Sequence, residues 1–560
     1  MASNNYPHPI PVYRAAICDA LPRLLSTLDR EPLSKSYGCA DRVFWCWKFT
    51  DFPGARFQEI AYALAQLAAD PSLLPHPVAS VKTLQTWAKA AITYWRRLQH
   101  RDGSFDEAYP YERSLAATAF TSFYVGQAFL ALHDSYDLDE RETLVAAFIA
   151  AGDWLCRGEE RHGILSNHLA AAAAALQTIA EITGENRFKE RRDYFIQRIL
   201  SYQSEEGWYE EYGGADVGYQ THTTFYLGYV WQRTQDDGLL QSLASSIRYF
   251  WHFLHVDGSL GGEYGSRNTR FFMPAGFELL AGSIPEAAAI AAFMRTSLAQ
   301  NQSVGLLTMD SQNILPFLNN YILAQRLALP LDEGKLPALP HHRSGVTHFE
   351  KSGHLVVVCA NYQVIIGLAK GGTVNVFSKA LTASGASWSN AGVALKFFNG
   401  KHASSQGLGC STVFAQDECQ VTVKAHFTEI NQILMAWKPF IVFRMVSALA
   451  AVVPGFAYGL KYLLVACLVR RKKSCPLRLS RTIRWDARTV IVEDEITMDQ
   501  RMPVRHLVVG GRFSAIHMGS ARYFEWQELQ EAADEPLSQQ KLDMLNTTGT
   551  ICVTTQWRAP

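Results

Sequence analysis

The spacing of apolar residues divides the chain into two parts with different secondary structure. From Tyr13 to about Leu329, apolar residues recur at three- and four-residue intervals, as in 58–69 and 144–155, which predicts helices throughout. Beyond residue 343, short runs rich in β-branched and aromatic residues predict strands at 354–360, 362–368, 373–377, 393–398, 420–427, 489–495 and 550–556. This order predicts an α+β multidomain protein in which helical hairpins precede an antiparallel β-sandwich.

A short glycine-containing phrase recurs between the predicted helices. Its glycines are Gly103, Gly163, Gly207 and Gly258, which are 60, 44 and 51 residues apart, about the length of two helices and their loops. Helical hairpins of this length close into an α/α toroid, an incomplete barrel whose repeated loops lie on one rim of a central cavity. The alternative is that each glycine turn merely ends a helix.

The predicted domains are an α/α toroid over 1–329 and a β-sandwich over 344–560, joined by a proline-rich linker at 330–343. An apolar insertion, 440–473, interrupts the second domain. Its longest uncharged stretch, 445–460, is 16 residues long and contains Pro454-Gly455, so it is short for a bilayer crossing. A bent pair of apolar helices in the membrane interface, with the basic run 470–473 beside it, fits this pattern. A buried hairpin or an oligomer contact is the alternative.

Composition excludes some classes of function. Lys plus Arg and Asp plus Glu are both 52, so no overall field attracts nucleic acid. The 10 cysteines lack metal-type spacing, which favours free thiols in a reducing compartment. The first 25 residues do not resemble a signal peptide, so we expect a cytoplasmic protein with peripheral or monotopic membrane association. Nucleotide-binding and common hydrolase motifs are absent from the sequence, and we expect no cofactor.

Three polar clusters follow the predicted rim loops. The first is Asn167-His168 at the start of an Ala-rich helix, where the helix N-terminus favours a bound carboxylate, although Asn167 or Ser166 could serve only as the helix cap. The second runs from Glu211 to Tyr219, His222 and Tyr226, which share one helical face and could instead be an aromatic core stripe. The third contains Arg267, which could bind a carboxylate or form a helix-end salt bridge.

These clusters carry a resemblance to a known family. Asn167-His168, the phrase 216–219 (Asp-Val-Gly-Tyr), the strand phrase 489–496 and the opening phrases 36–42 and 44–47 resemble the heparinase II/III-like polysaccharide lyases and their alginate-lyase and uronosyl-epimerase relatives. The resemblance implies an acidic polysaccharide or oligosaccharide as the partner. One departure is that 387–392, where the family usually places a His-x-His-x-Asp-like phrase, contains no His. We therefore expect no zinc site.

The resemblance also implies roles for individual residues. Asn167 and His168 would neutralise the uronate carboxylate, Tyr219 would protonate the leaving oxygen, and Tyr219, His168 or His222 would remove the adjacent ring proton. Substrate-binding residues would be Arg267, Glu211, Tyr226, Tyr37 and Arg42.

The predicted reaction is β-elimination from a uronic-acid-containing polysaccharide. Uronosyl epimerisation shares its first step and stays open. The sequence also leaves open a hydrolase using Glu210 or Glu211 with Asp216 or Glu263, and a non-catalytic, membrane-attached protein of exopolysaccharide assembly. It does not indicate the oligomeric state.

Overall fold

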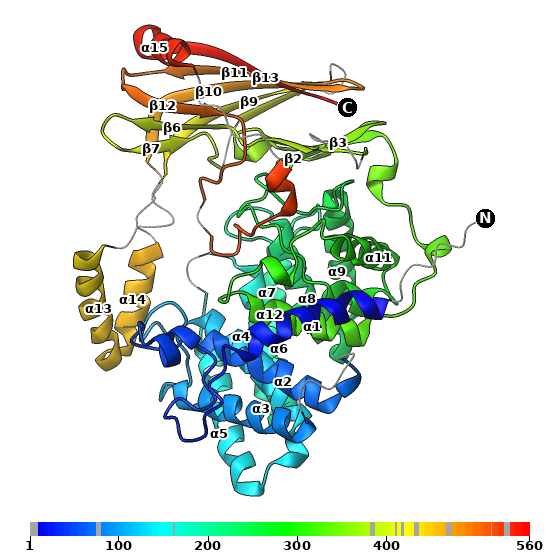
Figure 1. Ribbon diagram of the computed structural model, residues 1–560, viewed down its shortest axis with the longest axis vertical. Coiled ribbons are helices and arrows are strands. Elements are labelled where there is room, and N and C mark those ends of the chain that lie inside the picture. Colours follow the sequence, from blue (N-terminus) through cyan, green and yellow to red (C-terminus); the bar gives the residue numbers. More distant parts are fainter. Residues whose placement is uncertain are drawn as a thin grey trace.

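The computed structural model describes residues 9–73, 80–160, 163–380, 387–408, 411–415, 419–430, 436–465, 473–516, 518–530 and 538–560. A block of helices precedes a block of antiparallel strands, and the strands lie over one end of the helical block (Figure 1). The predicted fold class, an α/α toroid followed by an antiparallel β-sandwich, is confirmed. The domain boundaries proposed at 329 and 344 stay predictions.

An inner ring of helices forms the centre of the toroid. Its members are α2 (Ile60–Ala69), α4 (Leu115–Ala131), α6 (Ser166–Thr183), α8 (Val217–Thr234), α10 (Ala275–Leu280) and α12 (Ile314–Leu327). Each of these helices contacts the next, and α12 contacts α2. Helices α4, α6 and α8 are buried on nearly every side, as expected where neighbours surround a helix.

An outer layer of helices surrounds this ring. It contains α1 (Pro9–Leu25), α3 (Val81–Leu98), α5 (Leu138–Arg157), α7 (Asn186–Ser201), α9 (Asp237–Phe250) and α11 (Pro285–Ala299). Each outer helix packs on an inner one, for example α3 on α2 and α7 on α6. Their buried residues recur at three- and four-residue intervals, so one face is apolar and the other faces solvent.

The repeated glycines belong to loops that lead from an outer helix to the N-terminus of the next inner helix, as predicted. Gly207 shows why the residue is needed: its φ is +99°, and an added Cβ would lie 2.3 Å from the carbonyl oxygen of Ser245 on α9. Gly103 packs in the same way against Ala150 on α5. Gly163 differs, because nothing lies within 4 Å of its Cβ position. The turn glycines at 103 and 207 therefore anchor their loops to outer helices.

Two antiparallel sheets follow. The five-stranded sheet has the order β1 (Gly345–Phe349), β2 (His354–Val358), β3 (Tyr362–Gly367), β4 (Thr373–Ser378) and β5 (Ser387–Asn390). The eight-stranded sheet has the order β12 (Val504–Val509), β6 (Val393–Phe397), β7 (His402–Ser404), β9 (Gln420–Glu429), β10 (Ser474–Trp485), β11 (Thr489–Met498) and β13 (Thr550–Arg558), and β8 (Ser411–Ala415) pairs with β9.

One apolar core joins the two sheets, with Val364 and Val376 on the first and Val423 and Val492 on the second. Helix α15 (Gln539–Thr548) contacts both edge strands of the larger sheet, β12 and β13, so this sheet curls. Each of the seven strand runs predicted from the sequence overlaps an observed strand and extends at most two residues beyond its end. The prediction missed β1, β5, β7, β8, β10 and β12.

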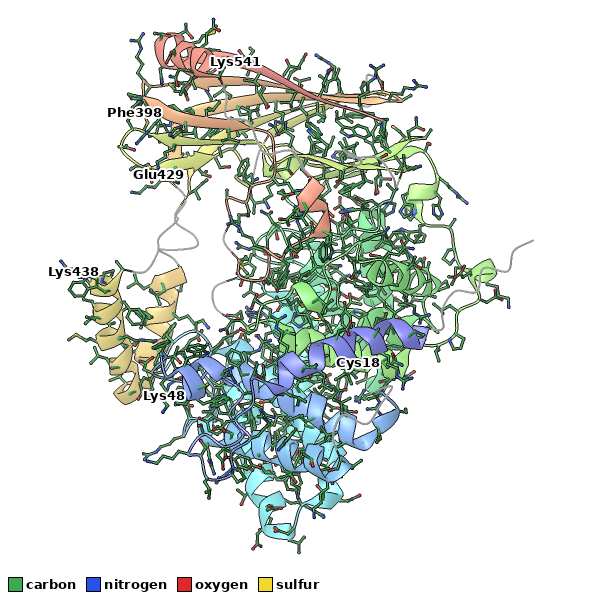
Figure 2. The ribbon with its side chains drawn as sticks, viewed as in Figure 1. Cys18, Lys48, Phe398, Glu429, Lys438 and Lys541 are labelled. Carbon is green, nitrogen blue, oxygen red and sulfur yellow. The ribbon has the colours of Figure 1, made fainter. Side chains whose placement is uncertain are left out.

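The apolar insertion forms a helical hairpin, α13 (Trp437–Val452) and α14 (Pro454–Val465), with its bend at the predicted Pro-Gly. The hairpin lies beside the toroid (Figures 1 and 2). An ion pair of 3.0 Å joins Arg444 to Asp51, another of 3.1 Å joins Lys461 to Glu112, and the ring of Phe443 lies 5.1 Å from that of Tyr109. Within the described ranges, no helix is both long and apolar enough to span a bilayer.

Candidate active site

The candidate residues gather where α6 and α8 begin. Leu165, just before α6, forms a β-bridge with Glu211 in the loop that leads to α8. The hydroxyl of Ser166 donates to the carbonyl oxygen of Glu210 over 2.7 Å. These bonds bring two loops, 44 residues apart in sequence, to one place on the rim. The N-cap of α6 is Leu165, so the alternative in which Ser166 or Asn167 serves only as the helix cap is wrong.

Asp216 connects the start of α8 to a third loop. One oxygen of its carboxylate accepts from the backbone N–H of Tyr219 over 3.3 Å and caps the helix. The other oxygen accepts from the backbone N–H groups of Arg267, over 2.9 Å, and Thr269, over 3.4 Å. Asp216 therefore places Arg267 beside Tyr219. A capping Asp was visible in the sequence, but its bond to the third loop was not.

Arg267 places a partly buried cation in the site. Its guanidinium carbon lies 3.9 Å from the centre of the Tyr212 ring. Among the residues that the structure describes, no carboxylate lies within ion-pair distance of this guanidinium, and its Nε has no hydrogen-bond partner. Burial lowers the pKa of Arg267, while Tyr212, Tyr219 and Glu211 act in the opposite direction. The helix-end salt bridge considered from sequence is not formed, and the guanidinium is free to bind an anionic ligand.

His168 has a carboxylate partner that the sequence did not reveal. Its Nδ1 lies 2.8 Å from Oε2 of Glu160, which is only 2% exposed. Because a carboxylate only accepts, this bond places the proton on Nδ1 and leaves the lone pair on Nε2. The imidazole is half-buried, with 20% of the side chain accessible. His168 thus has the orientation of a general base.

Tyr219 contributes a protonated hydroxyl. Its oxygen lies 2.9 Å from Oγ of Ser520, in the segment that follows β12. Burial raises the pKa of this hydroxyl well above its ordinary value, and the neighbouring Tyr212 raises it further. The hydroxyl therefore keeps its proton at neutral pH, as a general acid requires.

Asn167 and Glu211 form a buried pair. The side-chain amide of Asn167 donates to Glu211 over 2.7 Å, and its backbone N–H donates to the other carboxyl oxygen over 3.3 Å. Burial raises the pKa of Glu211 to about 8, although both bonds from Asn167 lower it. Glu211 is thus largely neutral near pH 7. In this conformation the side-chain amide of Asn167 and both carboxyl oxygens of Glu211 are therefore engaged with each other.

The remaining predicted residues lie in different surroundings. His222 stacks on Phe120, with ring centres 5.2 Å apart, and burial lowers its pKa well below the ordinary value, so it is a poor base. Tyr226 is fully buried among aromatic rings, which favours the core-stripe interpretation for this residue. The guanidinium of Arg56, which the sequence did not single out, lies 4.2 Å from the centre of the Phe120 ring.

Tyr37 and Arg42 lie in the segment after α1. Arg42 donates to the carbonyl oxygen of Ser26 over 2.7 Å and lies over Trp45. Tyr37 is half-buried beside the Gly38 turn. These contacts do not involve the three clusters at the rim, so the substrate-binding role of Tyr37 and Arg42 stays a prediction. In the described part of the chain, no group of three or more His, Cys, Asp or Glu is placed to hold a metal ion.

Comparison with known proteins gives a family match in the helical part of the chain. Residues 76–276 match the family model described as the ulvan lyase N-terminal domain, and this range includes Asn167, His168, Tyr219 and Arg267. Among curated protein sequences, none matches the chain significantly.

Solved structures resemble the chain over most of its length. Paenibacillus xanthan lyase matches with a TM-score of 0.53 at 9% identity, over 90% of this chain and 46% of that one. Chondroitin AC lyase from Streptomyces coelicolor A3, in complex with chondroitin sulphate, matches with a TM-score of 0.53 at 11% identity, over 91% of this chain and 69% of that one. This chain therefore spans less than half of the xanthan lyase.

The fold is that of the toroid-and-sandwich polysaccharide lyases. Within the helical part, residues 76–276 match the ulvan lyase N-terminal domain model, which confirms the resemblance to polysaccharide lyases drawn from the sequence.

Proposed function

We propose that the protein is a polysaccharide lyase that cleaves a uronic-acid-containing polysaccharide by β-elimination. The observation that carries this proposal is the partly buried guanidinium of Arg267, which has no acidic partner among the described residues and lies beside a protonated tyrosine, Tyr219. A uronate carboxylate fits this cation. Because Glu211 is largely neutral near pH 7, it does not repel that carboxylate.

Each step of the proposed elimination can be assigned to a side chain of the site. Arg267 binds the uronate carboxylate and stabilises the negative charge that develops on it when the adjacent ring proton leaves. Nε2 of His168 accepts that proton, and Glu160 holds the resulting imidazolium. The bond between the ring and the O4 substituent breaks, a ring double bond forms, and Tyr219 donates its proton to the leaving oxygen. Solvent returns the proton to Tyr219 and removes the other from His168.

These roles refine those expected from the sequence. We assign binding of the uronate carboxylate to Arg267 in place of Asn167, because the side-chain amide of Asn167 is bound to Glu211. His168 takes the role of base in preference to His222, whose pKa is lowered by burial. Tyr219 keeps the role of acid.

Epimerisation on the same residues is the second candidate, because it shares the first step. The two reactions differ in whether the anion expels the O4 substituent or regains a proton on the other face. Incubation of alginate, polygalacturonate, ulvan and chondroitin sulfate in D₂O separates them. A lyase raises ultraviolet absorbance through the unsaturated product, whereas an epimerase incorporates deuterium without absorbance. If neither signal arises on any uronic polymer, the proposed reaction is rejected.

A hydrolase is less well supported, because three of its four candidate carboxylates are engaged. Glu211 is bound to Asn167, Asp216 accepts from three backbone N–H groups, and Glu263 accepts from Arg270 and Asn375. An opposed pair of accessible carboxyl groups, which hydrolysis of a glycosidic bond requires, is not formed by these residues.

Attachment to a membrane interface through the α13–α14 hairpin is a separate proposal. Large apolar side chains on the hairpin are at least 41% exposed: Trp437, Phe440, Ile441, Val442, Met445, Leu449, Val453, Tyr462 and Leu463. Trp47 and Phe49 are also exposed, on a loop that the Arg444–Asp51 ion pair joins to α13. The hairpin sequence 437–465 has no acidic residue, which suits anionic headgroups.

Vesicle sedimentation tests this attachment. The protein should pellet with vesicles of anionic phospholipid and resist release by high salt, because the contact is chiefly apolar. A variant with Ile441, Val442 and Met445 replaced by Ser should stay in the supernatant while its melting temperature is unchanged. If the parent protein stays in the supernatant in the presence of vesicles, membrane attachment is rejected and an oligomer contact becomes the explanation for the exposed apolar hairpin.

A further inference from the structure

A second feature outside the candidate active site is a row of cationic side chains on the large sheet. His506 on β12 is the register partner of Lys396 on β6, and Lys396 is the partner of His402 on β7. Register partners on adjacent strands point to the same face, and adjacent strands lie about 4.8 Å apart, so the row spans roughly 10 Å. Lys396 and His402 are half-buried and His506 is exposed.

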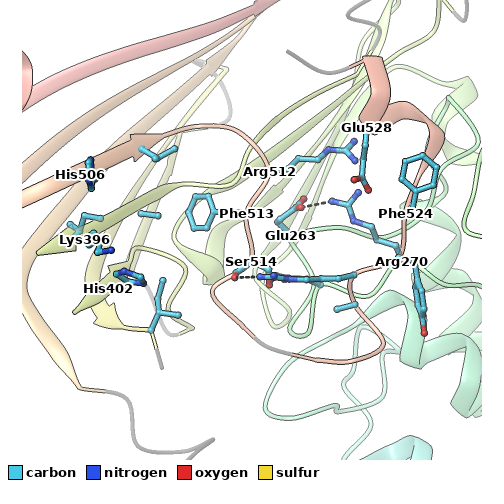
Figure 3. Close-up of a pocket in the computed structure, with 18 residues that line it drawn as sticks. Glu263, Arg270, Lys396, His402, His506, Arg512, Phe513, Ser514, Phe524 and Glu528 are labelled. Atoms are coloured by element: carbon cyan, nitrogen blue, oxygen red, sulfur yellow. Dashed lines mark hydrogen bonds and ion pairs between the residues drawn. The ribbon is translucent and has the colours of Figure 1, made fainter. Parts of the chain in front are cut away.

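This row forms one wall of a cavity of about 1100 Å³ between the sheet and the toroid. Figure 3 shows His506, Lys396 and His402 one beside the next, across the cavity from Arg270, Arg512 and Glu528. Phe513 and Phe524 also line the cavity, and Phe524 is 39% exposed. Aromatic faces beside charged groups suit a sugar chain that carries anions.

Basic side chains outnumber acidic side chains in the lining of the cavity. The other charged groups that line it are Glu263, Arg270, Arg512, Arg522 and Glu528. Arg270 pairs with Glu263 and Glu525, Arg512 pairs with Glu525, and beside His402 the neighbouring Lys401 pairs with Glu429. In the described parts of the chain, the side chains of Lys396, His402 and His506 have no hydrogen-bond or ion-pair partner. Like charges directly opposite each other on neighbouring strands are destabilising, and a bound anion would offset that cost.

A single segment connects this cavity to the candidate active site. Ser514 lines the cavity and accepts from the side-chain amide of Asn268, which follows Arg267. Ser520, six residues later, contacts the hydroxyl of Tyr219. The cavity and the Tyr219 hydroxyl are therefore in contact with the same stretch of chain after β12.

We propose that His506, Lys396 and His402 form an anion subsite that binds carboxylate or sulfate groups of the polysaccharide away from the reacting sugar, and that binding there strengthens on acidification. Protonation of an imidazole adds a positive charge, so acidification adds cationic charge to the row. The identity of the ligand rests on the proposed function, but the binding itself does not require turnover.

Binding of polymers to the full chain tests this subsite. The Tyr219→Phe background keeps the polymer intact while affinity is measured by calorimetry at pH 5.5 and 8.0 and constant ionic strength. The probes are alginate, which has carboxylates only, chondroitin sulfate, which adds sulfates, and neutral dextran. We expect both polyanions to bind about tenfold more tightly at pH 5.5, and dextran to show no such change. A gain confined to chondroitin sulfate would assign the subsite to sulfate groups.

The variant Lys396→Gln/His402→Gln/His506→Gln should bind at least tenfold more weakly at pH 5.5 and should lose the pH dependence. Lys424→Gln is the matched control, because Lys424 is exposed on β9 of the same sheet but does not line the cavity. Its affinity should equal that of the parent. Unchanged affinity or a persistent pH dependence in the triple variant overturns the subsite, and so does a parent that binds neither polyanion. Binding that follows these expectations in a protein without lyase activity would reject the proposed reaction and leave the subsite standing.

Discussion

Replacement of Tyr219 by Phe isolates the chemical role of one hydroxyl. The ring would keep its edge-to-face contact with Phe271, whose centre lies 5.5 Å away. Only the 2.9 Å hydrogen bond to Ser520 would be lost, and Ser520 is half-buried, so water can replace it. The expected loss of stability is about 1 kcal/mol. If the hydroxyl protonates the leaving oxygen, turnover should fall by about two to four powers of ten.

A second tyrosine on the same helix provides the control. The hydroxyl of Tyr229 lies 2.6 Å from the amide nitrogen of Gln127 and 3.2 Å from Oγ1 of Thr178, toward the other end of α8. Tyr229→Phe should therefore cost at least as much stability, about 1–2 kcal/mol, and leave turnover unchanged. Initial rates and melting temperatures of both variants are the measurements. Full activity in Tyr219→Phe would refute its role as the acid.

Three further substitutions test other parts of the structure. Arg267→Gln should lower kcat/KM on a uronic polymer by about 10- to 100-fold without loss of melting temperature, because it removes a buried charge that has no acidic partner among the described residues. The pKa of Glu211 is about 8 in the folded protein and near 4.5 in the unfolded chain. The parent should therefore lose stability relative to Glu211→Gln as the pH rises from 4.5 to 8, and the difference in stability should be constant above pH 8. Parallel curves of melting temperature against pH for the two proteins would contradict this. Asp494→Ala should cost about 3–5 kcal/mol in urea unfolding, because it leaves Arg481 buried without its partner; a loss below about 1 kcal/mol would contradict this.

The fold was largely predictable because its main signals are local. Three- and four-residue periodicity separates the toroid from the sandwich without knowledge of any long-range contact. The prediction failed on β10, whose inward-facing positions include Arg481. This arginine is fully buried and forms a bidentate ion pair with Asp494 on β11, with hydrogen bonds of 2.6 and 2.7 Å. Hydropathy alone treats a buried arginine as exposed, and its partner lies on another strand.

The candidate site was predictable in place and less so in detail. The phrases around Asn167, Tyr219 and Arg267 pointed to loops that the structure brings together. Their partners are set by tertiary contacts that no spacing reveals: Ser520 lies 301 residues from Tyr219. The burial that makes Glu211 a neutral partner of Asn167 also depends on packing. The residue types in the sequence therefore indicated the class of chemistry, whereas the role of each residue depends on the tertiary contacts that it makes.

The mass of the new chain end decides whether the protein is a lyase. A uronic polymer that the protein turns over would be digested and the oligosaccharides analysed by mass spectrometry, with Arg267→Gln in parallel. β-Elimination predicts that each new non-reducing end is lighter by one water than a hydrolytic end, and that the variant produces far fewer of these ends. Products with the full mass of hydrolysis, or equal amounts of unsaturated product from the variant, would contradict elimination at Arg267.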